Sequence, residues 1–438
     1  MSRARMKTFA AAALAAGLAL AGPAALAQDM LIRNAKVHTA GPQGTLDAAD
    51  VLVSGGVVRA VGPGLAAPAG AQVVDAQGRS LTPTLFGGIT EIGLEEVSAE
   101  EGTVDASLAL GVETKEMTVR PEFDVTLAYN PASVLVPVAR VEGIGWTLLG
   151  AGSTLGGSII GGQGGIVRLD GSADPVGARV LFVRLGSNAS GLTGKSRAAQ
   201  WMLLDQLIDE ARGRIGADSN MALLTPAGRR TLLRYLDDGG RVVVGVDRAA
   251  DIRQLLRWSK RQDVRIAIAG GAEAWMLAAD LAAAKVPVFI NPLDDLPSSF
   301  DAIHSSFGNA ARLDAAGVPV GFTLGDSHNA RKVRQLAGNA VAHGLPWEQG
   351  LAGLTSVPAQ AFGVADRMGR IAPGQRADLV LWSGDPLEVS TVALQVWMDG
   401  RAIEMRSRQT ELRDRYLHPQ RPRDQGGLPR AYPLPGEG

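Results

Sequence analysis

Four short apolar segments alternate with longer amphipathic segments in the second half of the chain. The apolar segments are RVVVGV at 241–246, VRIAIA at 264–269, PVFI at 287–290 and PVGFTL at 319–324. Runs of this length and composition are typical of buried parallel strands. A helical pattern follows each one, over residues 249–260, 272–284, 300–316 and 330–343. Successive strand–helix units predict an α/β fold, either a doubly wound sheet or a (β/α)8 barrel.

Both ends of the chain show a different pattern, with short strands and tight turns. Strand-like segments occupy residues 30–37, 51–54, 57–61 and 72–75, and again 377–382 and 394–399. Asp399-Gly400 is a hairpin turn signal after the last of them. Residues 84–240 are less regular, but they supply enough chain for four more strand–helix units.

A glycine-rich stretch at residues 156–165 invites comparison with a phosphate-binding loop. Such a loop needs Gly-Lys-Ser/Thr, or spaced glycines between a strand and a helix. No lysine follows here, and IVRL at 166–169 with Asp170-Gly171 reads as a strand and a turn. We therefore predict a glycine-rich β-hairpin or flap, with a nucleotide site as the weaker alternative.

Composition excludes several classes of function. The 438 residues are 46% hydrophobic and 20% charged, which is enough to form a large core. The formal net charge of −1 gives no basic field for nucleic acid. The chain has no cysteine, so disulfides, zinc–thiolate sites and thiol nucleophiles are absent from its chemistry.

The first 27 residues predict a signal peptide. Arg3, Arg5 and Lys7 precede an apolar run at 9–20, and Ala25-Leu26-Ala27 fits a cleavage site after Ala27. The alternative is a buried N-terminal helix. We expect export to the periplasm and no membrane anchor in the mature chain, because no later stretch has 18 uninterrupted apolar residues. Residues 406–438 predict an extended or disordered tail, since the end of the chain is rich in Pro, Gly and Arg.

Fixed motifs occur near both ends of the chain: DAQG at 75–78 with LTP at 81–83, LTSVPA at 354–359, and GRIAPGQRADLVLW at 369–382 with GDP at 384–386. They resemble the motifs of the amidohydrolase superfamily, and most closely those of its imidazolonepropionase-like members. The resemblance implies a TIM-like (β/α)8 barrel over 83–364. It also implies a small β-sandwich domain built from residues 28–82 together with 365–405.

Relatives in this family hydrolyse C–N bonds of cyclic amides and related compounds with one or two divalent metals, such as zinc. The resemblance places the ligands at His-x-His after strand 1, a Lys or Glu on strand 4, His on strands 5 and 6, and Asp on strand 8. In this chain those positions hold Ile89-Thr90-Glu91, Gly245, Gly270 or Gly271, and Asp326; the strand 4 position is not identified. Because glycine and isoleucine cannot bind a metal, we expect no metal ligands and no bound cofactor.

Polar residues near the predicted strand ends are the remaining candidates. Asp326 and Glu91 are the candidate catalytic residues, although Asp326 equally fits a helix N-cap and Glu91 a salt-bridge partner. The candidate ligand-binding residues are His328, Asp247, Arg248 and Arg184. His328 also fits a surface loop, and His304, in a predicted helix, fits a structural role.

Two functions compete on these grounds. The first is an exported amidohydrolase-family protein, ancestrally a hydrolase of C–N bonds, with a lost or weak metal site. The second is a non-catalytic binding protein or the inactive partner of an active amidohydrolase. Either would accept a small polar ligand, and the sequence leaves open a homo- or hetero-oligomer.

Overall fold

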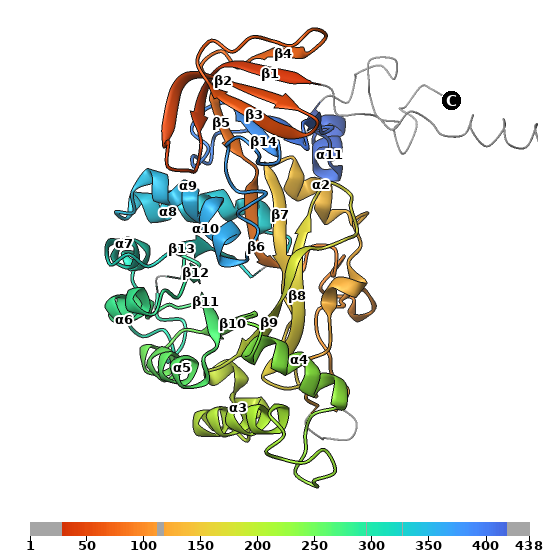
Figure 1. The fold of residues 1–438 in the computed structure, drawn as a ribbon, viewed down its shortest axis with the longest axis vertical. Helices are drawn as coiled ribbons and strands as arrows, with labels where there is room; N and C mark the ends of the chain where they lie inside the picture. The colour runs from red at the N-terminus through yellow and green to blue at the C-terminus, as the bar shows by residue number, and fades with distance from the viewer. Residues whose placement is uncertain (1–28, 112–117, 295, 326, 418–438) are drawn as a thin grey trace, which may run out of the picture.

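Two separate β-sheets organise the protein, as Figure 1 shows. The structure is a computed structural model that describes residues 29–111, 118–294, 296–325 and 327–417. One sheet is small and lies at the top of Figure 1, and the other is barrel-shaped with helices packed around it. The predicted signal peptide lies outside the described residues. No helix among the described residues is long and apolar enough to cross a membrane.

The small sheet combines strands from both ends of the chain, as predicted. Its order is β16-β15-β14-β5-β1-β2-β3, with β4 beside β1. The strands are β1 Met30–His38, β2 Thr45–Ser54, β3 Val57–Gly62, β4 Gln72–Asp75, β5 Ser80–Pro83, β14 Leu379–Trp382, β15 Ala393–Met398 and β16 Arg401–Ala402. β5 joins the two ends because it pairs with β1 on one side and with β14 on the other. The Trp382 indole N–H donates to Thr82 Oγ1 at 2.8 Å, a contact across 300 residues.

The second sheet has eight strands in the order β13-β12-β11-β10-β9-β8-β7-β6. They are β6 Leu85–Thr90, β7 Ile144–Leu149, β8 Ile160–Arg168, β9 Val176–Arg184, β10 Arg241–Val246, β11 Arg265–Gly270, β12 Val288–Ile290 and β13 Val320–Phe322. Thr323, just after β13, completes the circle, because its Oγ1 accepts from Ile89 N at 2.9 Å and its own N donates to Ile290 O. The barrel-shaped sheet predicted from the second half of the chain is confirmed.

One strand departs from the all-parallel barrel. β8 is antiparallel to both β7 and β9, so residues 84–240 do not form four strand–helix units. β8 and β9 form the hairpin predicted from the glycine-rich stretch. Its glycines let neighbouring backbones approach closely: a Cβ at Gly164 would meet Leu149 O at 1.8 Å, and one at Gly161 would meet Ala151 O at 2.5 Å.

Helices cover the outer face of the barrel strands and fill the links between them (Figure 1). The α-helices are α2 Leu135–Arg140, α3 Arg197–Ala211, α4 Pro226–Leu236, α5 Ala249–Gln262, α6 Ala278–Ala283, α7 Asn309–Ala315, α8 Val333–Ala342, α9 Trp347–Gly353, α10 Ser356–Ala361 and α11 Arg408–Leu417. Short 3₁₀ helices are Glu101–Thr103, Val125–Ala128, Ser187–Leu192, Ala274–Leu277 and Ala330–Lys332.

Two segments differ from the expected secondary structure. The helix expected over 300–316 covers only α7, and residues 300–308 form a loop held by side chains of Asp301 and His304. The tail expected to be extended from residue 406 contains α11 instead. Ser407 and Thr410 cap that helix reciprocally, with Ser407 N donating to Thr410 Oγ1 at 2.8 Å and Thr410 N to Ser407 Oγ at 3.3 Å. Residues 418–438 lie outside the described residues.

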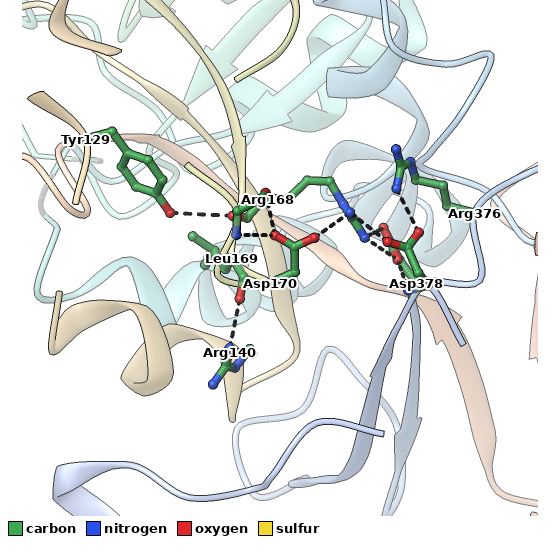
Figure 2. A network of polar contacts seen from close by, with 9 residues as sticks. Tyr129, Arg140, Arg168, Leu169, Asp170, Arg376 and Asp378 are labelled. Atoms are coloured by element: carbon green, nitrogen blue, oxygen red, sulfur yellow. Dashed lines mark hydrogen bonds and ion pairs between the residues drawn. The ribbon is translucent and has the colours of Figure 1, made fainter. Parts of the chain in front are cut away.

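A buried ionic network joins the barrel to the small sheet (Figure 2). Because β8 is reversed, its last residue, Arg168, lies at the end of the barrel next to the small sheet. The Arg168 guanidinium donates to Asp378 at 2.9 and 3.2 Å and to Asp399 at 2.9 Å, and it pairs with Asp170 at 2.5 Å. Arg376 also binds Asp399 at 2.7 Å. Burial opposes the charge on Arg168, but its carboxylate partners outweigh this and raise its pKa.

Candidate active site at the barrel mouth

The carboxyl ends of the parallel barrel strands form the face where barrel enzymes carry their chemistry. Several of the residues predicted from the sequence lie here. Glu91 follows β6, Arg184 ends β9, Asp247 and Arg248 follow β10, and His328 follows β13 in the chain. Asp326 lies outside the described residues, so its position stays a prediction.

Glu91 and His328 belong to one polar group on the β6 and β13 side of the mouth. The backbone N–H of Glu91 donates to Ser327 Oγ at 2.9 Å. His328 Nε2 lies 3.5 Å from Glu95 Oε1, and Glu95 is largely buried. Burial raises the pKa of Glu91, Glu95 raises it further, and Arg184 acts in the opposite direction. The sequence analysis missed Glu95 and Ser327, since neither falls on an expected ligand position.

Asp247 lies at the end of β10, on another side of the mouth. Its Oδ1 accepts from Ala272 N at 3.3 Å. Burial raises the pKa of Asp247, and the nearby carboxylates of Asp294 and Asp301 raise it further, whereas Arg184 lowers it. Arg184 is therefore a positive charge that acts on both Glu91 and Asp247. Arg248 instead precedes α5, where its charge acts on Asp251.

The first expected ligand position is part of the apolar interior of the barrel. Ile89 packs against the inner cluster that includes Phe86, Trp146, Phe182 and Phe289. Its side chain is close enough to β7 that a Cβ at Gly150 would meet Ile89 Cγ2 at 2.9 Å. The position therefore closes the hydrophobic core under the mouth and presents no donor to it.

The positions where the family resemblance predicts histidines on strands 5 and 6 differ in the room they leave for a side chain. Gly245 on β10 has room, because a Cβ there would meet only ordinary contacts near 3.8 Å. Gly270 and Gly271, at the end of β11, have φ of +98° and +68°, which L side chains rarely adopt. A Cβ at Gly270 would meet Asp247 Oδ1 at 2.5 Å, and a Cβ at Gly271 would enter the outer core against Val288.

The residues at these strand ends do not fit the divalent metal centre that the family resemblance implies. Among the described residues, no three or more His, Asp or Glu side chains come together in a way that could hold a metal ion. Tight zinc sites need three or four well-placed ligands. Isoleucine and glycine cannot supply them, and β11 ends in Gly270, which has no side chain.

The loop that follows β12 is tied across the rim of the mouth. Asp301, a buried residue of this loop, accepts from Ser187 N at 2.7 Å and Ser187 Oγ at 2.6 Å, after β9. Arg197 of α3 pairs with Asp301 and also with Asp251 of α5. Ser187 and Arg197 are each more than 100 residues from Asp301 in the sequence. Sequence spacing therefore gave no signal for these contacts.

Comparisons with known proteins agree with this architecture. A family model described as Amidohydrolase family (Amidohydro_3) matches residues 323–403. Amidohydrolase tasK from Hapsidospora irregularis is 42% identical over 74 residues, which are 17% of this chain and only 8% of that protein's length. An amidohydrolase structure from Thermotoga maritima MSB8 superposes with a TM-score of 0.74 at 24% identity, covering 86% of this chain and all of that one. Molinate hydrolase superposes with a TM-score of 0.50 at 15% identity, over 94% of this chain and all of that one.

The fold is that of a solved amidohydrolase, a barrel with an accessory sheet built from both chain ends. In sequence, the C-terminal segment of the chain is similar to the amidohydrolase family. The narrower likeness to imidazolonepropionase-like members stays a prediction. The matched segment, 323–403, lies around the closing motif and leaves most of the mouth unmatched in sequence.

Proposed function

We propose that this chain is an exported, periplasmic superfamily member of hydrolytic ancestry whose mouth binds a small polar ligand without metal-dependent hydrolysis. The observation that carries the proposal is the identity of the ligand positions: Ile89, Gly245, Gly270 and Gly271 stand where donors are expected. Hydrolysing an amide without metal-activated water would need a substitute worth many kcal/mol of barrier lowering.

The charges that remain at the mouth support binding of a polar molecule. Glu91 and Asp247 present partly buried carboxylates. Arg184 is a positive charge that lowers the pKa of both. A ligand with separated positive and negative groups would complement this set. Asp326 extends the set if it faces the mouth, as its place after β13 predicts.

Metal content tests the proposal directly. Elemental analysis of the purified chain should find less than one zinc per chain. Added zinc should leave the melting temperature unchanged, because a ligand stabilises a fold only when it binds the native state. One or two tightly bound transition metals per chain would overturn the proposal, as would zinc-dependent hydrolysis of a dipeptide such as Ala-Pro.

A second candidate is the inactive partner of an active amidohydrolase. The observation in its favour is the loop after β12, where Phe300 is 87% exposed and Leu296 is 72% exposed. Contiguous exposed apolar patches are typical of interaction surfaces, and Leu296, Phe300 and Ile303 are all exposed in this one loop. Light scattering of the purified chain, alone and mixed with a metal-containing superfamily member, would test this candidate, with Phe300→Ser as the variant that should prevent association.

A further inference from the structure

His304 is fixed in place on the functional face by contacts at both its backbone and its ring. It lies in the loop between β12 and α7. Its backbone N and its ring Nδ1 each lie 3.0 Å from Glu273 Oε1, and its carbonyl accepts from Trp275 Nε1 at 2.8 Å. The contact between Nδ1 and Glu273 Oε1 fixes the orientation of the ring.

Glu273 is a buried carboxylate that can only accept hydrogen bonds when ionised. Its Oε2 accepts from Ala249 N at 2.9 Å, and Oε1 accepts from His304. Burial alone would raise the pKa of Glu273, but these hydrogen bonds and the charge of His304 lower it overall. The ionised carboxylate assigns the proton of a neutral His304 to Nδ1. Nε2 then carries the lone pair, and 59% of the side chain is exposed.

We propose that His304 and Glu273 form an acid–base dyad that acts without a metal on small carboxylic esters. His304 is the catalytic residue and Glu273 its positioning residue. The proposal goes beyond ligand binding at the mouth and does not depend on it.

The step balances with water as the only co-reactant. His304 Nε2 takes a proton from a water molecule as the water oxygen bonds to the acyl carbon. The bond from that carbon to the alkoxy oxygen then breaks, and the imidazolium returns the proton to the leaving oxygen. Glu273 stays ionised and stabilises the imidazolium. Esters suit this chemistry because their leaving group needs less activation than that of an amide.

The surroundings of His304 agree with an apolar ester. Ile303 is exposed on the same loop, and Arg312 of α7 lies 4.2 Å over the ring of Trp275. The nearby Asp301 is already paired with Arg197. Glu273 is thus the charged partner that contacts the His304 ring.

The chain offers a matched control in His343, which is also exposed. Its Nδ1 lies 2.8 Å from the carbonyl oxygen of Asn339, so it has a neutral partner where His304 has a carboxylate. We would measure hydrolysis of p-nitrophenyl butyrate by the full chain, with His304→Gln, His343→Gln and Glu273→Gln. His304→Gln should lower kcat/KM about a hundredfold, at the low end of general-base effects. His343→Gln should change it less than twofold.

The split between kcat and KM separates catalysis from a structural role. Glu273→Gln should lower kcat and leave KM within about twofold of the parent, since Glu273 orients His304 and does not contact the ester. Circular dichroism checks that each variant is folded. A His304→Gln rate within twofold of the parent, or a parent rate no greater than that of free imidazole at equal concentration, would overturn the proposal.

Discussion

The two ends of the barrel differ in how well their residues match the motifs of the amidohydrolase superfamily. At the end next to the small sheet, the closing motif is present. Its acidic residue, Asp378, binds Arg168 in a buried ionic network. At the mouth, the positions where the family resemblance predicts metal ligands carry Ile89 and glycines. Resemblance at one end of a barrel therefore says little about the chemistry at the other end.

The largest effect should come from the joint between barrel and sheet. Replacing Arg168 by Met leaves the buried Asp378 carboxylate without its counter-charge, which costs about 3–5 kcal/mol. Chemical denaturation measures this loss. Arg214→Met is the matched control, because its ion pair with Asp209 is exposed and should matter by less than about 1 kcal/mol. Equal losses of stability in the two variants would show that the Arg168 network matters no more than an exposed ion pair.

His38 makes the same joint sensitive to pH. Its ring is buried against Trp347 of α9, at 4.6 Å between centroids, and burial followed by Lys36 lowers its pKa from 6.5 to about 4. As pH falls, the unfolded chain takes up this proton first. Stability from His38 is therefore complete above pH 6.5 and falls by up to about 3 kcal/mol as the pH approaches 4. Unfolding of His38→Gln across this range should show a smaller slope; an unchanged slope would contradict the assignment.

Two glycines at the mouth should respond differently to the same change. Gly270→Ala places a Cβ against Asp247 at a positive φ and should cost about 1–3 kcal/mol. Gly245→Ala has room and should cost less than about 1 kcal/mol. Thermal unfolding of both variants compares them. If Gly270→Ala is as stable as Gly245→Ala, neither the positive φ nor the contact to Asp247 requires glycine at position 270.

The smallest effect should come from Glu91. Burial and Glu95 raise its pKa, so the ionised form is disfavoured in the native state at neutral pH. The contribution of Glu91 to the free energy of unfolding is fully present below the pKa of the unfolded chain. It is lost as the pH rises through the raised pKa of the folded state. Glu91→Gln should therefore stabilise the protein at pH 7 by up to about 1 kcal/mol, as expected of a site kept for function. Denaturant midpoints at pH 4 and 7 test this, and a clear loss of stability at pH 7 would show that Glu91 is structural.

The sequence was most informative where regular patterns or fixed motifs exist. Apolar runs such as 264–269 located the barrel strands, and the motif at 369–382 located the small sheet. β8 was harder to predict because five of its nine residues, Gly161, Gly162, Gly164 and Gly165 with Gln163, carry no strand signal. Its direction depends on how backbones pack, which no single-residue preference encodes.

The site was predictable only in part for a similar reason. Glu91 and His328 could be assigned to one end of the barrel because both follow predicted strands. Glu95 and Glu273 could not, since their importance depends on burial and on partners far away in sequence. His304 was placed in a helix by periodicity, whereas side-chain contacts to Glu273 hold it in a loop.

The contact between Trp382 and Thr82 has a consequence for how the chain is made. The two residues are 300 positions apart, and synthesis adds about 5–20 residues per second. β14 is therefore synthesised roughly 15–60 s after β5. The β8–β9 hairpin, whose strands are neighbours in sequence, has no such delay. The first strands to be synthesised are therefore among the last to be completed, and until then the edge of β5 that pairs with β14 has no partner strand.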